Sequence, residues 1–171
     1  MRYSPLVLTL IIFMIVSCNS EQKQEVVEIK SKSLPKPILV DSFYCYAKGI
    51  LFEGNNIKFQ FDKVEFLKSD MAKKAMVEDG LISNNEMPPN DFYLRNKDEE
   101  IETALIDSNI VIIMQTHSYD ADGNFKINER ISLDELRILL SPNYERNYIN
   151  YLFEIKLENS KIIQITEKYI P

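Results

Sequence analysis

Six polar side chains that interrupt apolar runs are the residues of this sequence best suited to chemistry. They are Asp62, Glu65, Asp91, Asn96, Glu167 and Tyr169. Two neighbouring carboxylates, such as those of Asp62 and Glu65, can act as a general acid and a general base, or can bind a cation. The competing interpretation is that they make turn and surface contacts, as acidic side chains usually do. The second interpretation is favoured, and the six residues stand as candidates for a polar site with no assigned reaction.

Residues 118–129 have the spacing of a calcium-binding loop. In a twelve-residue loop of the EF-hand type, oxygen ligands at alternate positions surround the ion, a glycine permits a sharp turn and a final glutamate closes the site. Asp120, Asp122, Gly123 and Glu129 would take these places. The spacing alone therefore allows a metal site.

The other residues of this segment argue against calcium. Such a loop begins with Asp, whereas Ser118 offers only a neutral hydroxyl, and Lys126 puts an ammonium where a water ligand belongs. Residues 110–116 also have the β-branched composition of a strand, not of an entering helix. We therefore predict that residues 120–123 form a β-hairpin turn, with calcium binding through Asp120, Asp122 and Glu129 as the alternative. No other metal and no cofactor is implied.

Cysteine and histidine give no catalytic signature. Only Cys18 and Cys45 occur, and Cys45 lies in an aromatic, strand-like run, so we predict a buried structural thiol. A nucleophilic thiol needs a nearby base, and the single histidine, His117, is far away in sequence. We expect its imidazole to be hydrogen-bonded or exposed to solvent. Gly-x-Ser-x-Gly, phosphate-binding glycine loops and zinc-type clusters are also missing, which favours a non-enzymatic role and leaves no catalytic residue assigned.

The charge of the chain excludes nucleic acid as a partner. The formal net charge is −6, and residues 1–17 contain one Arg and no acid, so a chain lacking them carries −7. Phosphate backbones are bound by basic surfaces, and no basic run interleaved with aromatic residues occurs.

Alternation of apolar and polar residues predicts a series of strands. They cover residues 43–52, 57–67, 91–94, 110–116, 149–157 and 161–170, with a further strand around residues 125–131. The apolar phase slips at Asp62 and Lys63, which predicts a bulge or a sharp bend there.

Two short helices are expected between these strands. Ser69 offers an N-cap for the first, whose apolar stripe is Met71, Ala72, Ala75 and Met76 and which ends at Gly80. The second begins with the capping-box spacing of residues 132–135, carries Leu133, Leu136 and Leu140, and ends at Ser141 and Pro142. Hairpins with segregated helices predict one α+β domain over residues 38–171, with a mostly antiparallel sheet.

The N-terminal segment is typical of an export signal. Arg2 precedes an apolar run, residues 6–16, that is too short to span a membrane but suits a signal peptide. The run ends at Ile15-Val16-Ser17-Cys18, which resembles the lipobox of bacterial lipoproteins. That resemblance implies that residues 1–17 are a signal peptide cut after Ser17, and that the Cys18 thiol carries a membrane-anchoring lipid.

Two alternatives stay open for this segment, namely an ordinary signal peptide with a coincidental cysteine and an uncleaved membrane anchor. By resemblance to Gram-negative sorting rules, Asn19 after the cysteine favours the outer membrane over the inner one. Residues 18–37 are rich in Glu, Gln, Lys and Ser and read as the lipidated N-terminus and a flexible tether, which spans on the order of 25 Å.

Four blocks within residues 43–171 resemble a widespread, uncharacterised bacterial secreted domain. They are residues 61–67, 72–75, 90–96 and 166–171. The family's usual glycine in the last hairpin is replaced by Ser160. The resemblance implies a single exported domain and no particular chemistry.

The sequence thus supports two function hypotheses, with calcium binding as a third. The favoured one is a lipid-anchored binding or accessory module of the cell envelope, whose partner is an envelope protein or peptide. It requires a contiguous exposed aromatic or aliphatic surface. The alternative is a small carboxylate-dependent hydrolase, which requires Asp62, Glu65 or Glu167 to converge in a concave pocket.

Overall fold

Seven strands dominate the computed structural model, which describes residues 40–146 and 148–170. The strands are β1 (Val40–Glu53), β2 (Asn56–Lys68), β3 (Phe92–Arg95), β4 (Ile101–Met114), β5 (Glu129–Ile131), β6 (Leu152–Glu158) and β7 (Lys161–Glu167). The helices are α1 (Ser69–Glu78), α2 (Leu133–Leu139) and the 3-10 helix η1 (Tyr148–Asn150). The expected signal peptide, Ser17, Cys18 and the tether lie outside the described residues.

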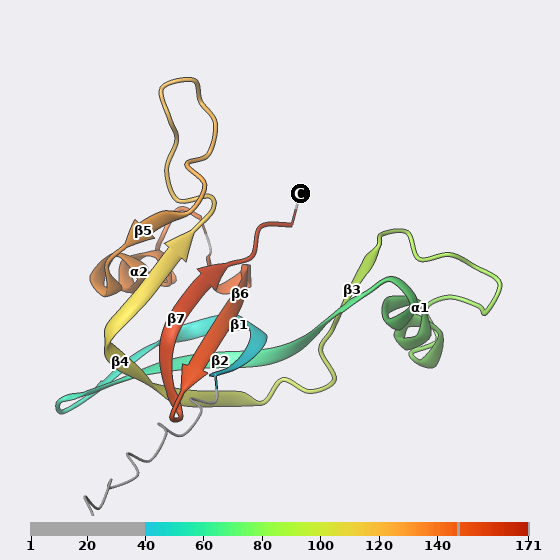
Figure 1. Ribbon diagram of the computed structural model, residues 1–171, viewed down its shortest axis with the longest axis horizontal. Helices are drawn as coiled ribbons and strands as arrows, with labels where there is room; N and C mark the ends of the chain where they lie inside the picture. Colours follow the sequence, from blue (N-terminus) through green and yellow to red (C-terminus); the bar gives the residue numbers. More distant parts are fainter. Residues whose placement is uncertain (1–39, 147, 171) are drawn as a thin grey trace, which may run out of the picture. The chain divides into compact units, whose positions relative to one another are not determined.

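Five of the strands close into a barrel (Figure 1). β1 pairs antiparallel with both β2 and β6, β2 with β4, and β6 with β7. The ring is completed by β4 and β7, which run parallel. Because strands make up about half of the described residues, the chain is mostly β, and the expected α+β class is corrected. The predicted preponderance of antiparallel pairs is confirmed.

The barrel bends at a bulge in β1. The pairing of β1 with β2 shifts between Ala47 and Gly49, which leaves Lys48 as the extra residue. Gly49 has a φ of 155°, which side-chain-bearing residues rarely adopt, so glycine is required at the bend. The bulge expected at Asp62 and Lys63 is wrong, because β2 continues in register there and its partner strand carries the irregularity.

The barrel interior is a continuous apolar core. Cys45, Phe59, Phe153, Ile155 and Ile165 are fully buried. Each large apolar side chain buried in this way contributes about 1.5–3 kcal/mol to folding. The pattern that predicted these strands therefore also identifies the inward face.

Helix α2 adds its apolar side chains to the same core. Leu136 and Leu139 are buried in one cluster with the barrel residues. The predicted capping box is confirmed, since the Ser132 hydroxyl accepts from the backbone N–H of Glu135 and the Glu135 carboxylate accepts from the N–H of Ser132.

The β6–β7 turn needs no glycine. Asn159 and Ser160 have φ values of 50° and 64°, the two positive values of a type I′ turn. Ser160 therefore takes the place where glycine is more common. Before β6, residues 148–150 form η1, so the strand predicted from residue 149 begins at Leu152.

Helix α1 packs beside the extension of β2 that lies beyond its pairing with β4 (Figure 1). Ala72, Ala75 and Met76 are buried as predicted, whereas Met71 is 64% exposed. Gly80 ends the helix as expected: its N–H donates to Val77, and the next N–H reaches back to Met76.

The prediction that Ser69 is the N-cap of α1 is wrong. The N-cap is Lys68, which makes no side-chain cap, and the Ser69 hydroxyl donates to the Asp91 carboxylate at 3.3 Å. The backbone N–H of Ser69 also donates to the carbonyl of Asp91. The serine therefore ties the helix start to the segment that leads into β3.

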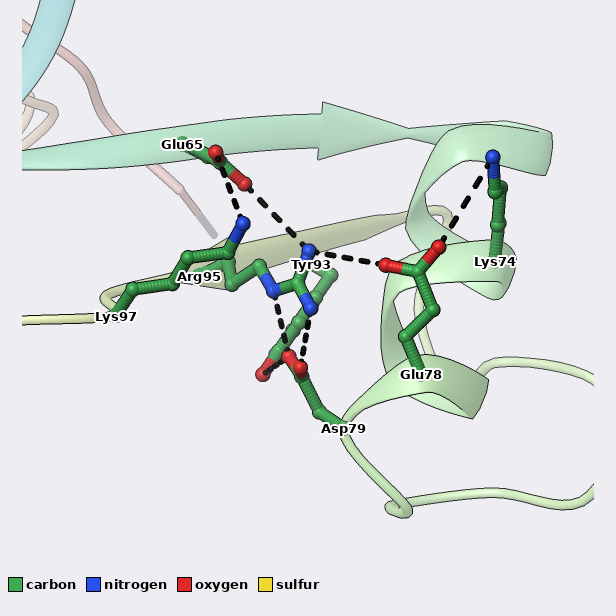
Figure 2. A network of polar contacts seen from close by, with 7 residues as sticks. All are labelled: Glu65, Lys74, Glu78, Asp79, Tyr93, Arg95 and Lys97. Carbon is green, nitrogen blue, oxygen red and sulfur yellow. Dashed lines mark hydrogen bonds and ion pairs between the residues drawn. The ribbon is translucent and has the colours of Figure 1, made fainter.

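Arg95 fastens α1 to the sheet (Figure 2). Its Nε donates to Asp79 Oδ2 at 2.8 Å, and its Nη1 lies 3.2 Å from Glu78 Oε2 and 3.9 Å from Glu65 Oε2. Tyr93 also donates to Asp79, at 3.0 Å. The hydrogen bond from Arg95 holds the pKa of the Asp79 carboxyl below its usual range, with help from Tyr93.

We predict that acid loosens α1 before it affects the barrel. The pKa of Asp79 is lower in the folded state than its ordinary value of 3.8, so its stabilising effect is complete above that value and is lost as the pH falls through the folded pKa. Hydrogen exchange between pH 6 and pH 3, corrected for the intrinsic rate, should show a several-fold loss of protection in α1 alone. Arg95→Met should show the same loss already at pH 6. Equal protection of α1 in Arg95→Met and in the unaltered chain would contradict this role.

Candidate functional site

Asp62 is a buried carboxylate with an unpaired oxygen. Its side chain is 2% exposed. Oδ2 lies 3.3 Å from the Lys48 ammonium and accepts a hydrogen bond from Asn96 Nδ2 at 3.1 Å, whereas Oδ1 is buried and has no hydrogen-bond partner among the described residues. Buried polar atoms are nearly always paired, so an unpaired carboxylate oxygen marks a place where a donor is expected.

Four separate segments place the side chains around Asp62. Asp62 and Tyr46 are direct cross-strand partners on β2 and β1. Lys48 occupies the β1 bulge, Asn96 directly follows β3, and Asn150 ends η1. Phe61 points into the core, so its neighbour Asp62 faces the outer side of the barrel, where these segments cover it.

A cavity of about 380 Å³ lies over this carboxylate. Its lining, called the Asp62 cavity below, consists of Tyr46, Lys48, Asp62, Asn96, Glu99 and Asn150. Two acids and one lysine give it a formal charge of −1. Burial raises the pKa of Tyr46, and the charge of Asp62 raises it further, so the phenol stays protonated as a donor.

A second cavity, of about 320 Å³, shares the Tyr46 and Asn150 walls of the first. This tyrosine groove is lined by Tyr46, Leu94, Asn150, Tyr151, Leu152, Lys168, Tyr169 and Ile170. Burial raises the pKa of Tyr151 as well. A polar cavity and a groove with apolar and aromatic walls therefore lie next to each other, which is the usual composition of a ligand site.

Aromatic side chains continue from the groove towards the hairpin of residues 118–129. The rings of Tyr169 and Phe125 are 6.2 Å apart, and those of Phe125 and Tyr119 stack at 4.8 Å. Arg146 lies 5.1 Å from the Tyr119 ring and 5.4 Å from the Phe125 ring. Tyr119 and Tyr169 are each 48% exposed. We call these three rings the aromatic surface.

Glu167 belongs to a different, fully paired network. Its carboxylate is 1% exposed and accepts from the backbone N–H groups of Gln115 and Thr116, at 2.7 and 2.9 Å, and from the Thr116 hydroxyl. The Thr116 carbonyl in turn accepts from Tyr148 and Arg146. Glu167 therefore holds the end of β4 against β7.

Two of the remaining candidates, Glu65 and Asp91, lie apart from Asp62. Glu65 belongs to the ion pairs of Arg95 and lines a cavity other than the Asp62 cavity, and Asp91 accepts from Ser69. The carboxylate pair expected from Asp62 and Glu65 is therefore not formed, because the two side chains face different surroundings. Asn96 is the one candidate that contacts Asp62, and Tyr169 lines the adjoining groove.

Several residues of the site were not predicted from the sequence. Lys48 had a signal, because a glycine inside a strand pattern, here the following Gly49, often marks a bulge. Asn150 and Tyr151 had none, since the alternation around them indicated a strand. Glu99 had none either, since it lies between the strands predicted at residues 91–94 and 110–116.

Residues 118–129 form the predicted hairpin. Tyr119 and Phe125 make a β-bridge, and Glu129 accepts a hydrogen bond from the Ser118 hydroxyl at 2.7 Å. The backbone N–H groups of Asn124 and Asp122 donate to the Asp120 carboxylate, and these bonds hold its pKa below the usual range. The loop oxygens at Asp120 and Glu129 thus stabilise the turn itself.

The surroundings of Cys45 and His117 are those of structural residues and not of a catalytic pair. Cys45 is fully buried as predicted, and burial, followed by the charges of Asp62 and Glu102, raises the pKa of its thiol. His117 is half-buried, and no described residue pairs with its buried Nδ1, so the expected hydrogen bond is not found at this nitrogen.

A larger cavity, of about 480 Å³, lies elsewhere on the barrel. It is lined by Asn55, Asn56, Ile57, Leu105, Ile106, Asp107, Ser108, Ile110, Leu133 and Lys161. Every one of these residues is exposed or half-buried, so no desolvated polar group faces it. The Asp62 cavity, with its buried charge, is the stronger candidate.

The order of the barrel strands is that of the OB-fold, a five-stranded Greek-key barrel. Counted within the barrel, the third and fifth strands, β4 and β7, are the parallel pair, and α2 lies between the third and fourth. Proteins of many functions share this fold, so it assigns none. Comparison with protein-family models, curated proteins and solved structures gives no match. Within the described residues no helix is long and apolar enough to cross a membrane.

The two buried carboxylates should respond differently to amide substitution. Glu167→Gln keeps one acceptor oxygen for three donors, so it should lower the free energy of unfolding by about 2 kcal/mol. Asp62→Asn keeps an oxygen for Lys48 and Asn96 and removes a buried charge, which offsets the cost of an amide group without an acceptor at the Oδ1 position, so it should stay within about 1 kcal/mol of the unaltered chain. Urea unfolding measures both. A larger loss for Asp62→Asn than for Glu167→Gln would refute the assignment of Oδ1 as unpaired.

Proposed function

We propose that this protein is a lipid-anchored, extracytoplasmic binding module that holds a segment of an envelope protein or peptide. The observation that carries the proposal is the aromatic surface of Tyr119, Phe125 and Tyr169, which runs without interruption into the tyrosine groove. Exposed tyrosines supply large contact areas at low entropic cost, and such rings dominate binding energy in protein interfaces.

The dimensions of the two cavities support an extended segment as the ligand. Each falls within the volume range of small-ligand sites, and they share the walls formed by Tyr46 and Asn150. A peptide can fill the groove with an apolar side chain and reach the Asp62 cavity with a polar one. A large folded partner would instead need a broad, flat surface.

The hydrolase alternative lacks its required geometry. Glu167 is held by its three donors and Glu65 by Arg95, so neither faces Asp62. The calcium alternative assigns Asp120, Asp122 and Glu129 to an ion, whereas the hairpin already uses Asp120 and Glu129 to stabilise its own turn. The contacts of the described residues therefore favour neither alternative.

Attachment to the membrane is the second part of the proposal. It rests on the lipobox at residues 15–18, with cleavage after Ser17 and a lipid on Cys18. The tether, residues 18–37, would keep the barrel near the membrane surface. If the cell is Gram-negative, Asn19 favours the outer membrane.

Selection from a displayed random-peptide library tests the binding function. Peptides that bind the unaltered chain should lose at least about tenfold in affinity for a Tyr151→Ala, Tyr169→Ser double variant, because truncating central aromatic anchors costs 1–2 kcal/mol or more. The matched control is Phe52→Ser, which alters a 55% exposed ring that lines neither cavity. Peptides that bind the double variant as tightly as the unaltered chain would exclude the groove as the site.

Mass spectrometry of the processed protein tests the anchor. We expect a diacylglyceryl mass on Cys18 and a free thiol on Cys45, since Cys45 is fully buried in the core. Cys18→Ser should remove the lipid and leave an uncleaved or wrongly cleaved precursor, because lipidation requires that thiol. A disulfide between Cys18 and Cys45, with no acyl mass, would refute the lipoprotein assignment.

A further inference from the structure

The unpaired oxygen of Asp62 indicates what kind of group the Asp62 cavity takes. Both Lys48 and Asn96 approach Oδ2, and Oδ1 receives no hydrogen bond from the part of the chain that the structure describes. A desolvated carboxylate is stabilised most by a donor that carries positive charge. Oδ1 of Asp62 therefore lacks one hydrogen-bond donor, and a positively charged donor would stabilise it most.

Lys48 compensates the charge of Asp62 only in part. Its side chain is 36% exposed, and it stands in the bulge, outside the regular pairing of β1 with β2. An ammonium on a flexible, partly solvated stem can leave a buried carboxylate at little cost if another cation replaces it. Asn96, in contrast, is neutral and cannot compensate the charge.

We propose that the Asp62 cavity binds the cationic side chain of a peptide, a lysine ammonium or an arginine guanidinium, and that Lys48 occupies this position until the ligand displaces it. The inference rests on the proposed function and names the ligand chemistry of the same site. On binding, the incoming cation takes donors to both oxygens of Asp62, and the Lys48 ammonium moves out to solvent.

The charges and the aromatic wall favour a cation over a neutral hydroxyl group. The lining has a formal charge of −1 from Asp62, Glu99 and Lys48. Tyr46 stands directly across from Asp62 and offers a ring to the cation. The chain as a whole carries −6, which raises the local concentration of cations and lowers that of anions.

If the ligand displaces Lys48, mutation of this lysine should have an unusual effect on the affinity for the ligand. Removal of Lys48 should strengthen binding, because an intramolecular competitor reduces the fraction of protein that is competent to bind. Lys48→Met should tighten the affinity about three- to tenfold on this basis. In a site where Lys48 helped to hold a ligand, the same change would weaken binding.

The test uses n-butylammonium, which has the shape of a lysine side chain, with 1-butanol as the neutral analogue and sodium chloride to match ionic strength. The reporter is the side-chain amide of Asn96, which donates to Asp62, followed by NMR during titration of the full-length chain in detergent. n-Butylammonium should shift this signal with saturation, and neither 1-butanol nor sodium chloride should do so. Equal shifts with 1-butanol would overturn the inference.

Three variants complete the experiment. Asp62→Asn should abolish the saturable shift, and its urea unfolding shows whether the fold is kept. Lys48→Met should lower the dissociation constant, whereas the matched control Lys58→Met, which breaks the surface pair with Glu53, should leave it unchanged. An unchanged or weaker affinity in Lys48→Met overturns the displacement.

The failure of this inference is distinguishable from failure of the proposed function. Library peptides that need Tyr151 and Tyr169, combined with no saturable n-butylammonium shift, would refute the cation site and leave the binding groove standing. Loss of both would refute both.

Discussion

The parallel pairing of β4 with β7 is the constraint on which the rest of this structure depends. Adjacent antiparallel strands can be joined by a tight turn, but a parallel pair needs a long connection. Here the connection runs through β5, α2, η1 and β6, and it brings α2 and β6 into contact with the same core. Because the two strands run parallel, their C-terminal ends lie at the same edge of the sheet, where Thr116 and Glu167 meet. The parallel register of β4 and β7 thus accounts for the closure of the barrel, the burial of α2 and the Glu167 network.

The candidate site follows from what the closed barrel excludes. Inward positions are filled by apolar side chains, so polar groups that gather must do so on the outer face. On β1 and β2 this face would be open to water, but the segments after β3 and before β6 cover it and bury Asp62. The bulge adds Lys48 at the rim. Burial of a charge outside the core is therefore produced by loops and not by the barrel itself, which suits a site that exchanges its occupant.

The parts of the fold that depend on local pattern were predictable from the sequence, and those that depend on distant pairing were not. The capping box at Ser132 and the helix stop at Gly80 are local, and both were predicted correctly. The bulge was placed at Asp62 because the apolar phase slips there, whereas the extra residue is Lys48 on the partner strand. The alternation of apolar and polar residues indicates which face of β2 is covered. It does not indicate which of the two paired strands carries the additional residue. The same limit explains the site: Asp62 and Asn96 were named, but their contact spans 34 positions.

The wide separation of the pairing strands has a consequence for the speed of folding. Register partners such as Leu105 and Lys161, or Ile113 and Thr166, are more than fifty positions apart, and each must meet before the barrel can close. Folding slows as contacts become less local, and β-barrels of this size fold in about milliseconds to seconds. Until closure, β4 and β7 each present an open edge that can pair with another chain. With Cys45 enclosed in the core, no disulfide within the described residues holds the edges together during that interval. Until β7 has paired with β4, aggregation of the chain is therefore limited only by dilution or by a chaperone that covers the open strand edges.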